Sequence, residues 1–229
     1  MLVVVTGLIG VGKSSLVEGL ARELNAKPFY EPLPETDNFM LAAYYKDPVR
    51  YSYSMQTLLL ALRFRAQQEA QWRSSRGELC IMDSSIYADQ AFLEVQKQCG
   101  YIDDLEYRAY HKLCEVHFGF LQYPDLHIHL DLPLEKEIER IKIRSRDCES
   151  GIQEDYLIKL RTAYDDLIPF LSHKYPLVHI DATQDKDGVL KDAIDLIRNR
   201  QQEMKEEDEK WPVYKKNTGY NKLDLDTVK

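Results

Sequence analysis

The segment LVVVTGLIGVGKSS, which runs from Leu2 to Ser15, decides the fold. An apolar run of strand length leads into GLIGVGKS, which fits the pattern G-x-x-x-x-G-K-[ST] at every fixed position, and a helical pattern follows. In such a unit the glycines let consecutive backbone N–H groups face phosphate oxygens, and the helix N-terminus adds positive potential. Lys13 is expected to reach the β- and γ-phosphates, and the Ser14 hydroxyl to bind Mg²⁺. The segment therefore predicts a nucleoside triphosphate site built by Gly7, Gly10, Val11, Gly12, Lys13, Ser14 and Ser15.

The composition is that of an ordinary soluble domain. The chain has 229 residues, of which 44% are hydrophobic and 30% charged, and its formal net charge is −8. This charge argues against duplex nucleic acid as the main partner, because phosphate binding needs a surplus of lysine and arginine. The four cysteines form no C-x-x-C pair, and no apolar window reaches the length of a signal peptide or a membrane span. These features predict a cytoplasmic protein with reduced thiols and no membrane contact.

Short apolar runs alternate with longer amphipathic stretches along the chain. Runs of strand length occur at Leu2–Val5, around Phe29, and at Leu79–Met82, Leu126–Leu130 and Leu177–Ile180. Helical periodicity occurs at Ser14–Leu24, Val49–Arg73, Ile86–Gln98, Asp103–Leu121, Leu134–Arg144, Glu154–His173 and Lys186–Lys205. This alternation is typical of βα units, so we expect an α/β fold with a five-stranded parallel sheet flanked by helices. Residues 1–204 are assigned to this domain, and the charged residues 205–229 to a solvated C-terminal tail.

The stretch LCIMD, Leu79–Asp83, ends an apolar strand on a carboxylate. Where this type of phosphate loop is present, an acid at the end of a second strand holds Mg²⁺ directly or through water. An aspartate that caps the following helix is the alternative, but beside an intact loop the metal interpretation is favoured. Asp83 therefore joins Ser14 as a predicted metal ligand. The histidines of HIHL, His127 and His129, are expected in a strand, because no third ligand is near them in the sequence.

Two further segments suggest what is done with the nucleotide. In RIKIRSRD, Arg140–Asp147, Arg140 and Arg144 share a helix face and Arg146 follows, so these arginines can neutralise a transferring phosphoryl group. A solvated basic face paired with nearby acids such as Glu137 is the alternative, and it is the better one for this segment taken alone. The short chain and its late basic segment favour a small-molecule kinase with a closing lid over a switch GTPase or a mechanical ATPase.

The segment FYEPLPE places Glu31 after a short β-like stretch and before a proline. A carboxylate at a strand end on the ligand side of an α/β sheet is well placed to take a proton from an acceptor hydroxyl. An exposed loop glutamate is the alternative, and it is the commoner situation in general.

Taken together, these segments resemble the deoxynucleoside kinase family. The matching stretches, in order, are GLIGVGKSSL, YEP, YYKDPVRYSYSMQTLLLALRFR, DSSIYAD and RIKIRSRDCESGIQEDYLIKL. The resemblance runs from Val3 to about Ile180. It implies a P-loop kinase fold with an arginine-containing lid at about residues 144–152, and transfer of the ATP γ-phosphoryl group to a deoxynucleoside 5′-hydroxyl, with Mg²⁺. It also implies nucleotide salvage as the role and a homodimer built on long helices such as Val49–Arg73 and Asp103–Leu121.

The resemblance assigns a role to each matching residue. Glu31 resembles the general base for the 5′-hydroxyl, and Gln56 the side chain that hydrogen-bonds the base edge. Tyr45 and Glu149 resemble the pair that holds the sugar 3′-hydroxyl. Arg63 and Asp89 match an ion pair that lines the base pocket and leaves little room for the thymine methyl group. The lid arginines that close over the ATP phosphates correspond to Arg140, Arg144 and Arg146.

The ion pair between Arg63 and Asp89 favours a purine deoxynucleoside or deoxycytidine over thymidine as the acceptor.

One position departs from the family, since Ser84 stands where an arginine contacts the acceptor oxygen and the transferring group. Its loss removes a charge-assisted contact. Another arginine, from the lid or Arg50, can fill the space, or the chain can be a deoxynucleoside monophosphate kinase with room for an acceptor phosphate near Ser84. A weakly active or inactive nucleotide-binding homologue acting in an assembly is the third alternative. An active enzyme is favoured, because the other catalytic positions are intact.

Overall fold

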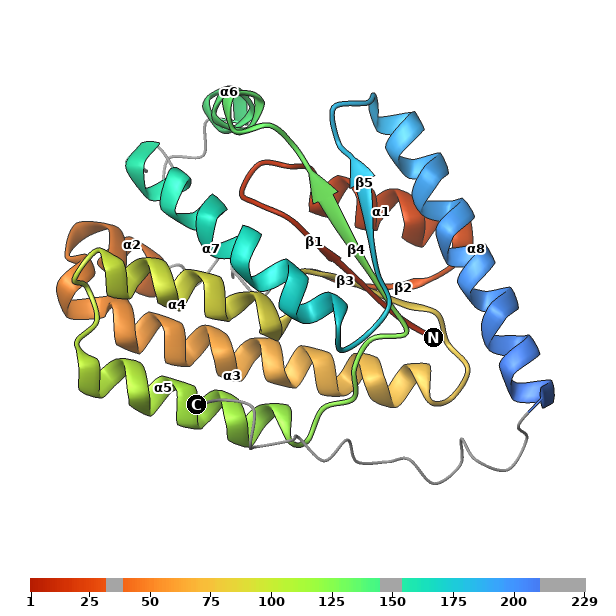
Figure 1. Ribbon diagram of the computed structural model, residues 1–229, viewed down its shortest axis with the longest axis horizontal. Helices are drawn as coiled ribbons and strands as arrows, with labels where there is room; N and C mark the ends of the chain where they lie inside the picture. The colour runs from red at the N-terminus through yellow and green to blue at the C-terminus, as the bar shows by residue number, and fades with distance from the viewer. Residues whose placement is uncertain (32–38, 145–153, 211–229) are drawn as a thin grey trace.

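The computed structural model describes residues 1–31, 39–144 and 154–210. Five strands form one sheet in the order β2-β3-β1-β4-β5, and every neighbouring pair is parallel (Figure 1). The strands are β1 (Leu2–Thr6), β2 (Lys27–Phe29), β3 (Cys80–Asp83), β4 (Leu126–Asp131) and β5 (Leu177–Asp181). The predicted five-stranded parallel sheet is therefore confirmed, and each strand lies within two residues of its expected place.

Helices cover both faces of the sheet (Figure 1). On one face lie α1 (Lys13–Leu24) and α8 (Lys186–Lys210). On the other face lie α3 (Pro48–Ser74), α4 (Asp89–Gln98), α5 (Asp104–Phe118) and α7 (Glu154–Ser172). The short helix α2 (Phe39–Lys46) packs on α3, and α6 (Leu134–Arg144) follows the carboxyl end of β4. A single 3₁₀ turn, η1 (Ile86–Ala88), precedes α4.

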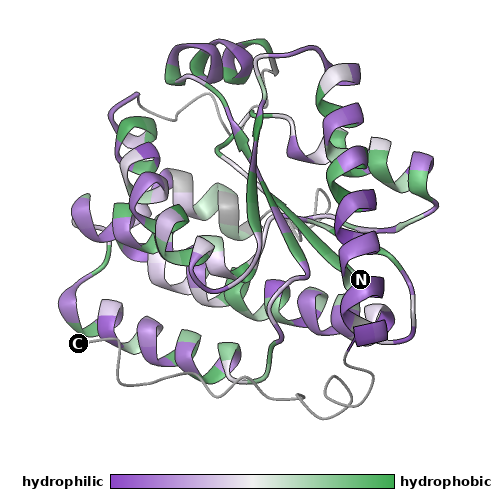
Figure 2. Ribbon diagram, turned by 45° about the vertical axis from the view of Figure 1, so that its right-hand side comes forward, coloured by the Kyte–Doolittle hydropathy of each residue, from purple (hydrophilic) through white to green (hydrophobic). Residues whose placement is uncertain are grey.

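The sheet lies in the middle of the core, which explains its continuous apolar runs. All residues of β1 and β3 are buried, and hydrophobic colour is concentrated on the strands and on the helix faces turned toward them (Figure 2). A parallel sheet covered on both faces has no solvent-exposed side, so its strands need no alternating polar residues. Among the helices in the described ranges, none is both long and apolar enough to span a membrane.

Two helix assignments differ from the sequence expectation. Helix α2 was not expected, because its sequence FMLAAYYK is short and apolar over most of its length and shows little amphipathic periodicity. Helix α8 continues to Lys210, past the expected domain boundary at residue 204. Its last turns are stabilised by Arg200, which pairs with Glu203 at 3.0 Å and with Glu207 at 3.2 Å. The part of the expected tail after Lys210 lies outside the described residues.

The histidines of HIHL belong to a buried hydrogen-bond chain between strands. Thr6 Oγ1 on β1 lies 2.6 Å from His127 Nε2 and 3.2 Å from His129 Nδ1, and His127 Nδ1 lies 3.1 Å from the Tyr175 hydroxyl. Burial lowers the pKa of His127 to about 3 and that of His129 to about 4, so both rings are neutral. Over the described ranges, no group of three or more His, Cys, Asp or Glu side chains is arranged to hold a metal ion. These histidines are part of the sheet, as expected.

Candidate functional site

The phosphate loop follows β1 and is held tightly by its neighbours. Gly7 has φ +143°, and a Cβ there would lie 2.8 Å from the Leu130 carbonyl oxygen of β4. Gly10 has φ +84°, and a Cβ there would lie 2.9 Å from Ile141 of α6. Both the backbone conformation and the close approach therefore require glycine at these two positions. Lys13 begins α1, and its ammonium group donates to the carbonyl oxygens of Gly7 at 3.0 Å and Leu8 at 2.9 Å.

Asp83 lies directly beside this loop because β3 pairs with β1, and Val5 is its partner in the register. The Ser14 hydroxyl donates to Asp83 Oδ2 at 2.5 Å. In the part of the chain that the structure describes, the other oxygen, Oδ1, is buried without a hydrogen-bond partner. Burial raises the pKa of Asp83, while the Lys13 ammonium and the Ser14 hydrogen bond lower it. A hydroxyl and a carboxylate with unused lone pairs are oxygen ligands that fit Mg²⁺.

The backbone turns sharply at Ser84, immediately after Asp83. Ser84 has φ +67°, in the left-handed region that non-glycine residues seldom adopt, and its N–H donates to the Val5 carbonyl oxygen at 2.8 Å. The residue is buried, and the neighbouring Ser85 Oγ has no partner within the described ranges. Backbone strain of this kind is concentrated at functional sites. Ser84, which replaces the family's arginine, thus lies in a constrained turn beside the phosphate loop.

Arg63 joins two carboxylates that are distant in the sequence. Its guanidinium, presented by α3, forms an ion pair with Glu31 after β2 and another with Asp89 at the start of α4. The side chains are 7%, 26% and 0% exposed for Arg63, Glu31 and Asp89, so Glu31 is the member that a solute can reach. The contact between Arg63 and Asp89 was anticipated from the sequence, whereas the contact with Glu31 was not. Arg63 therefore orients the carboxylate expected to act as the base.

Gln56 lies two helical turns before Arg63 on the same face of α3. It is 1% exposed, and its Nε2 has no hydrogen-bond partner in the described part of the chain. The Tyr110 hydroxyl donates to the backbone carbonyl oxygen of Gln56 and to Asp89 Oδ2, both at 3.5 Å. On α2, which packs on α3, Tyr44 hydrogen-bonds Tyr156 and Gln96, and burial raises its pKa to about 12. An inward-facing amide donor among buried aromatic rings can bind a flat heterocycle.

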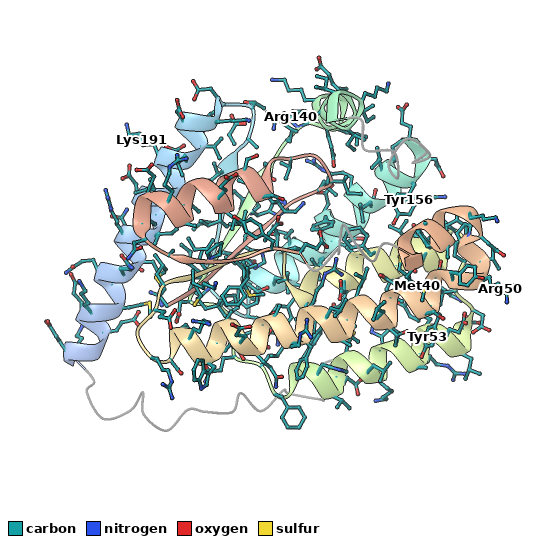
Figure 3. The ribbon with its side chains drawn as sticks, turned by 180° about the vertical axis from the view of Figure 1, so that it is seen from behind. Met40, Arg50, Tyr53, Arg140, Tyr156 and Lys191 are labelled. Carbon is teal, nitrogen blue, oxygen red and sulfur yellow. The ribbon has the colours of Figure 1, made fainter. Side chains whose placement is uncertain are left out.

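The expected lid residues are only partly described. Arg140 on α6 donates to the Val11 carbonyl oxygen of the phosphate loop at 3.0 Å and to the Ala182 carbonyl oxygen after β5 at 2.9 Å (Figure 3). It thus ties the loop to the end of β5. Arg144 is the last residue of α6 and Tyr45 lies in α2, but their side chains are not described. Arg146 and Glu149 lie outside the described residues, as does most of the expected lid at 144–152.

Two residues near the site were missed or misplaced by the sequence analysis. Glu137 was expected as a possible partner on a solvated basic face, but it is fully buried, because positions 134, 137, 138 and 141 form the inward stripe of α6. The spacing from Leu134 to Ile141 carried this signal. Tyr164 on α7 is also buried, and its pKa is raised by burial and by the nearby carboxylates of Glu31, Asp83 and Glu137. Because Tyr164 lies within the apolar stripe of α7, its sequence position is that of an ordinary core residue and does not indicate these neighbours.

Comparison with known proteins agrees with this geometry. The deoxynucleoside kinase family model matches residues 3–205. Deoxyadenosine kinase of Dictyostelium discoideum is 37% identical over 179 residues, covering 78% of this chain and 71% of that protein. Deoxyguanosine kinase of Lactobacillus acidophilus is 30% identical over 214 residues, covering 86% and 90% of the two chains.

Solved structures with the same architecture are also known. Deoxyadenosine kinase from M. mycoides, solved with dCMP and a flexible dCDP as products, superposes with a TM-score of 0.76 at 25% identity, covering 87% of this chain and all of that one. The parallel sheet, the phosphate loop and the family match together define a P-loop kinase fold and a phosphotransferase. This chain belongs to the deoxynucleoside kinase family.

Proposed function

We propose that the protein transfers the γ-phosphoryl group of ATP to the 5′-hydroxyl of a purine deoxynucleoside or of deoxycytidine. The product is the 5′-monophosphate, and the role is nucleotide salvage in the cytoplasm. The observation that carries this proposal is the largely buried junction of Glu31, Arg63 and Asp89, in which Glu31 remains reachable beside the phosphate loop. The relatives named deoxyadenosine and deoxyguanosine kinase support the choice of acceptor class.

The chemistry follows from the positions of the charged groups. The Glu31 carboxylate takes the proton of the 5′-hydroxyl, whose oxygen forms the new bond to the γ-phosphorus. The bond from that phosphorus to the bridging β–γ oxygen breaks, and ADP leaves. Lys13 stabilises the charge that develops on the phosphates, since its ammonium already lies on the inside of the loop. Arg144 and Arg146 are proposed to assist from the lid, and Arg140 to hold the loop in place.

Ser14 and Asp83 are proposed to hold Mg²⁺ through their oxygen atoms. The short hydrogen bond between them and the unused Asp83 oxygen support this assignment. When bound, the ion neutralises charge on the β- and γ-phosphates.

Acceptor selectivity is proposed to come from Gln56, Arg63 and Asp89, with Tyr45 and Glu149 on the sugar. The Gln56 amide is available to a base edge, and the ion pair beside it presents polar groups that must stay hydrogen-bonded. A thymine methyl group placed against them would leave buried charge unsolvated. Bases with an exocyclic amino or keto group and no methyl group at that edge fit better.

A panel of acceptors tests the proposal. With MgATP, we expect kcat/KM for deoxyadenosine, deoxyguanosine or deoxycytidine to exceed that for thymidine by at least about tenfold. The same panel includes the four 5′-monophosphates, because Ser84 leaves the acceptor end without the family's arginine. Turnover with monophosphates alone would make the protein a deoxynucleoside monophosphate kinase. No turnover with any acceptor would favour a nucleotide-binding homologue that acts in an assembly.

We also propose a homodimer formed through α3 and α5. These packed helices carry large exposed apolar side chains, with Val49 66%, Trp72 54%, Leu105 69% and Val116 61% exposed. Burying such side chains against a two-fold copy removes them from water. Sedimentation equilibrium at micromolar concentration should give twice the chain mass, and a monomer would contradict the assignment.

A further inference from the structure

Glu137 is a buried acid to which the proposed reaction gives no task. Its side chain is 0% exposed, and neither carboxylate oxygen has a hydrogen-bond partner in the described ranges. The residue lies against the phosphate loop, since its carbonyl oxygen is 3.7 Å from the place that a Cβ on Gly10 would take. Burying an ionised carboxylate without hydrogen bonds is among the costliest arrangements in a protein. The group must therefore be neutral for part of the working cycle or be offset by nearby charge.

The nearby cations do not fully offset it. Lys13 of the phosphate loop and Arg161 of α7 both favour the ionised form, but burial outweighs them and raises the pKa of Glu137 to about 7. Both cations have other partners, because Lys13 donates to two loop carbonyls and Arg161 to the Leu132 carbonyl oxygen at 2.6 Å. Arg140, on the same helix, is engaged with two backbone carbonyls.

The other titratable groups that face this region add no positive charge. Tyr164 of α7 is neutral, because burial raises its pKa far above the usual value. His129 of β4 lies near the same two cations and is neutral, because burial lowers its pKa to about 4 and both cations lower it further. Asp165 of α7 pairs with Arg161 at 3.4 Å and so takes up part of that cation's charge. Arg161 and, after it, Lys13 are therefore the cations that favour the ionised form of Glu137. Of the two, Lys13 is the group that bound phosphate would engage.

We propose that Glu137 is a proton-linked positioning residue of the phosphate loop, which must be protonated for the donor triphosphate to bind tightly at Lys13. An ionised carboxylate beside the loop repels the phosphates and competes for Lys13, whereas the carboxylic acid does neither. Binding of the donor therefore takes up a proton at Glu137. This inference rests on the proposed assignment of the loop as the site of the ATP phosphates.

The size of the effect follows from linkage. If the protonated form alone binds tightly, the apparent dissociation constant of the donor rises by up to about tenfold per pH unit above the pKa of the acid. Near pH 8 most Glu137 side chains of the free protein are ionised, so binding takes up close to one proton there, whereas near pH 6 it takes up little. Binding takes up a proton rather than releasing one, because a bound anion raises the pKa of a nearby acid.

The experiment measures MgATP binding from pH 6 to pH 9 by calorimetry, in two buffers of different ionisation enthalpy, for the wild-type protein and Glu137→Gln. Glutamine keeps the shape of the side chain and cannot ionise. We expect the variant to bind MgATP about tenfold more tightly than wild type at pH 8, equally at pH 6, and without the extra proton. The matched control is Glu135→Gln, an exposed acid on the same helix, which should behave like wild type.

The outcomes separate this inference from the proposed function. Equal pH dependence in wild type and Glu137→Gln, with MgATP bound by both, would overturn the inference and leave the donor site standing. No proton uptake by the wild-type protein at pH 8 would overturn it as well, and that measurement requires no folded variant. Failure of the wild-type protein to bind MgATP at any pH would instead overturn the donor site, and the inference with it.

Discussion

Replacement of Lys13 by alanine is expected to lower kcat/KM for phosphoryl transfer by about 10³-fold. The ammonium group lies inside the phosphate loop, on the carbonyl oxygens of Gly7 and Leu8, where it can meet the phosphates. Its loss removes a positive charge that acts more strongly on the transition state than on the bound donor, so kcat should fall by more than the affinity for ATP. Steady-state kinetics with the preferred deoxynucleoside at saturating Mg²⁺ measure the effect.

The control for this variant is Lys136→Ala. Lys136 is an exposed lysine on α6, and its removal should leave kcat/KM within about twofold of wild type, as for most surface positions. Circular dichroism of both variants should match that of the wild-type protein, because neither side chain is part of the core. If Lys13→Ala kept wild-type turnover, the loop would not be the donor site.

Glu31→Gln is expected to reduce kcat by about 10²- to 10⁴-fold, the usual contribution of a positioned general base. Glutamine has nearly the same shape and can still accept a hydrogen bond from Arg63, so the junction with Asp89 should survive. KM for the acceptor should change little, because the lost function is proton removal rather than binding. The same variant should lose the acidic limb of the pH–rate profile that reports the base.

Glu18→Gln is the matched control, since Glu18 is an exposed acid on α1. It should keep both kcat and the pH profile of the wild-type protein. Full activity in Glu31→Gln would remove Glu31 as the base and direct attention to Asp83, another carboxylate beside the loop. A fall in activity together with a lower melting temperature would indicate that the Arg63 junction had been lost, and a thermal melt distinguishes this case.

The fold and the donor side of the site could be predicted because both depend on local sequence. The loop conformation requires glycine at Gly7 and Gly10, and the adjoining strand and helix have clear periodicity. Asp83 could be placed beside the loop from its position at the end of an apolar strand, because carboxyl ends of parallel strands meet at one edge of the sheet. Each of these inferences used only short segments of the sequence.

The acceptor side was predictable only through the family resemblance, and then incompletely. Arg63 was matched to Asp89, but its second contact, with Glu31, arises because α3 crosses the sheet beside both strand ends. Glu137 was named only in the alternative of a solvated basic face, for a related reason. A glutamate on an amphipathic helix is usually solvated, and the sequence does not show that the inward face of α6 covers the phosphate loop.

The sequence by itself therefore determined the parallel sheet, the phosphate loop and the residues able to bind phosphate, because backbone conformation and periodicity are properties of short segments. Only the tertiary structure decided which charges meet. Arg63 lies between Glu31 and Asp89, and Glu137 lies near Lys13 without a hydrogen-bond partner in the described chain, through contacts between elements far apart in sequence. Burial sets the protonation of such groups, and burial is known only once the helices are packed.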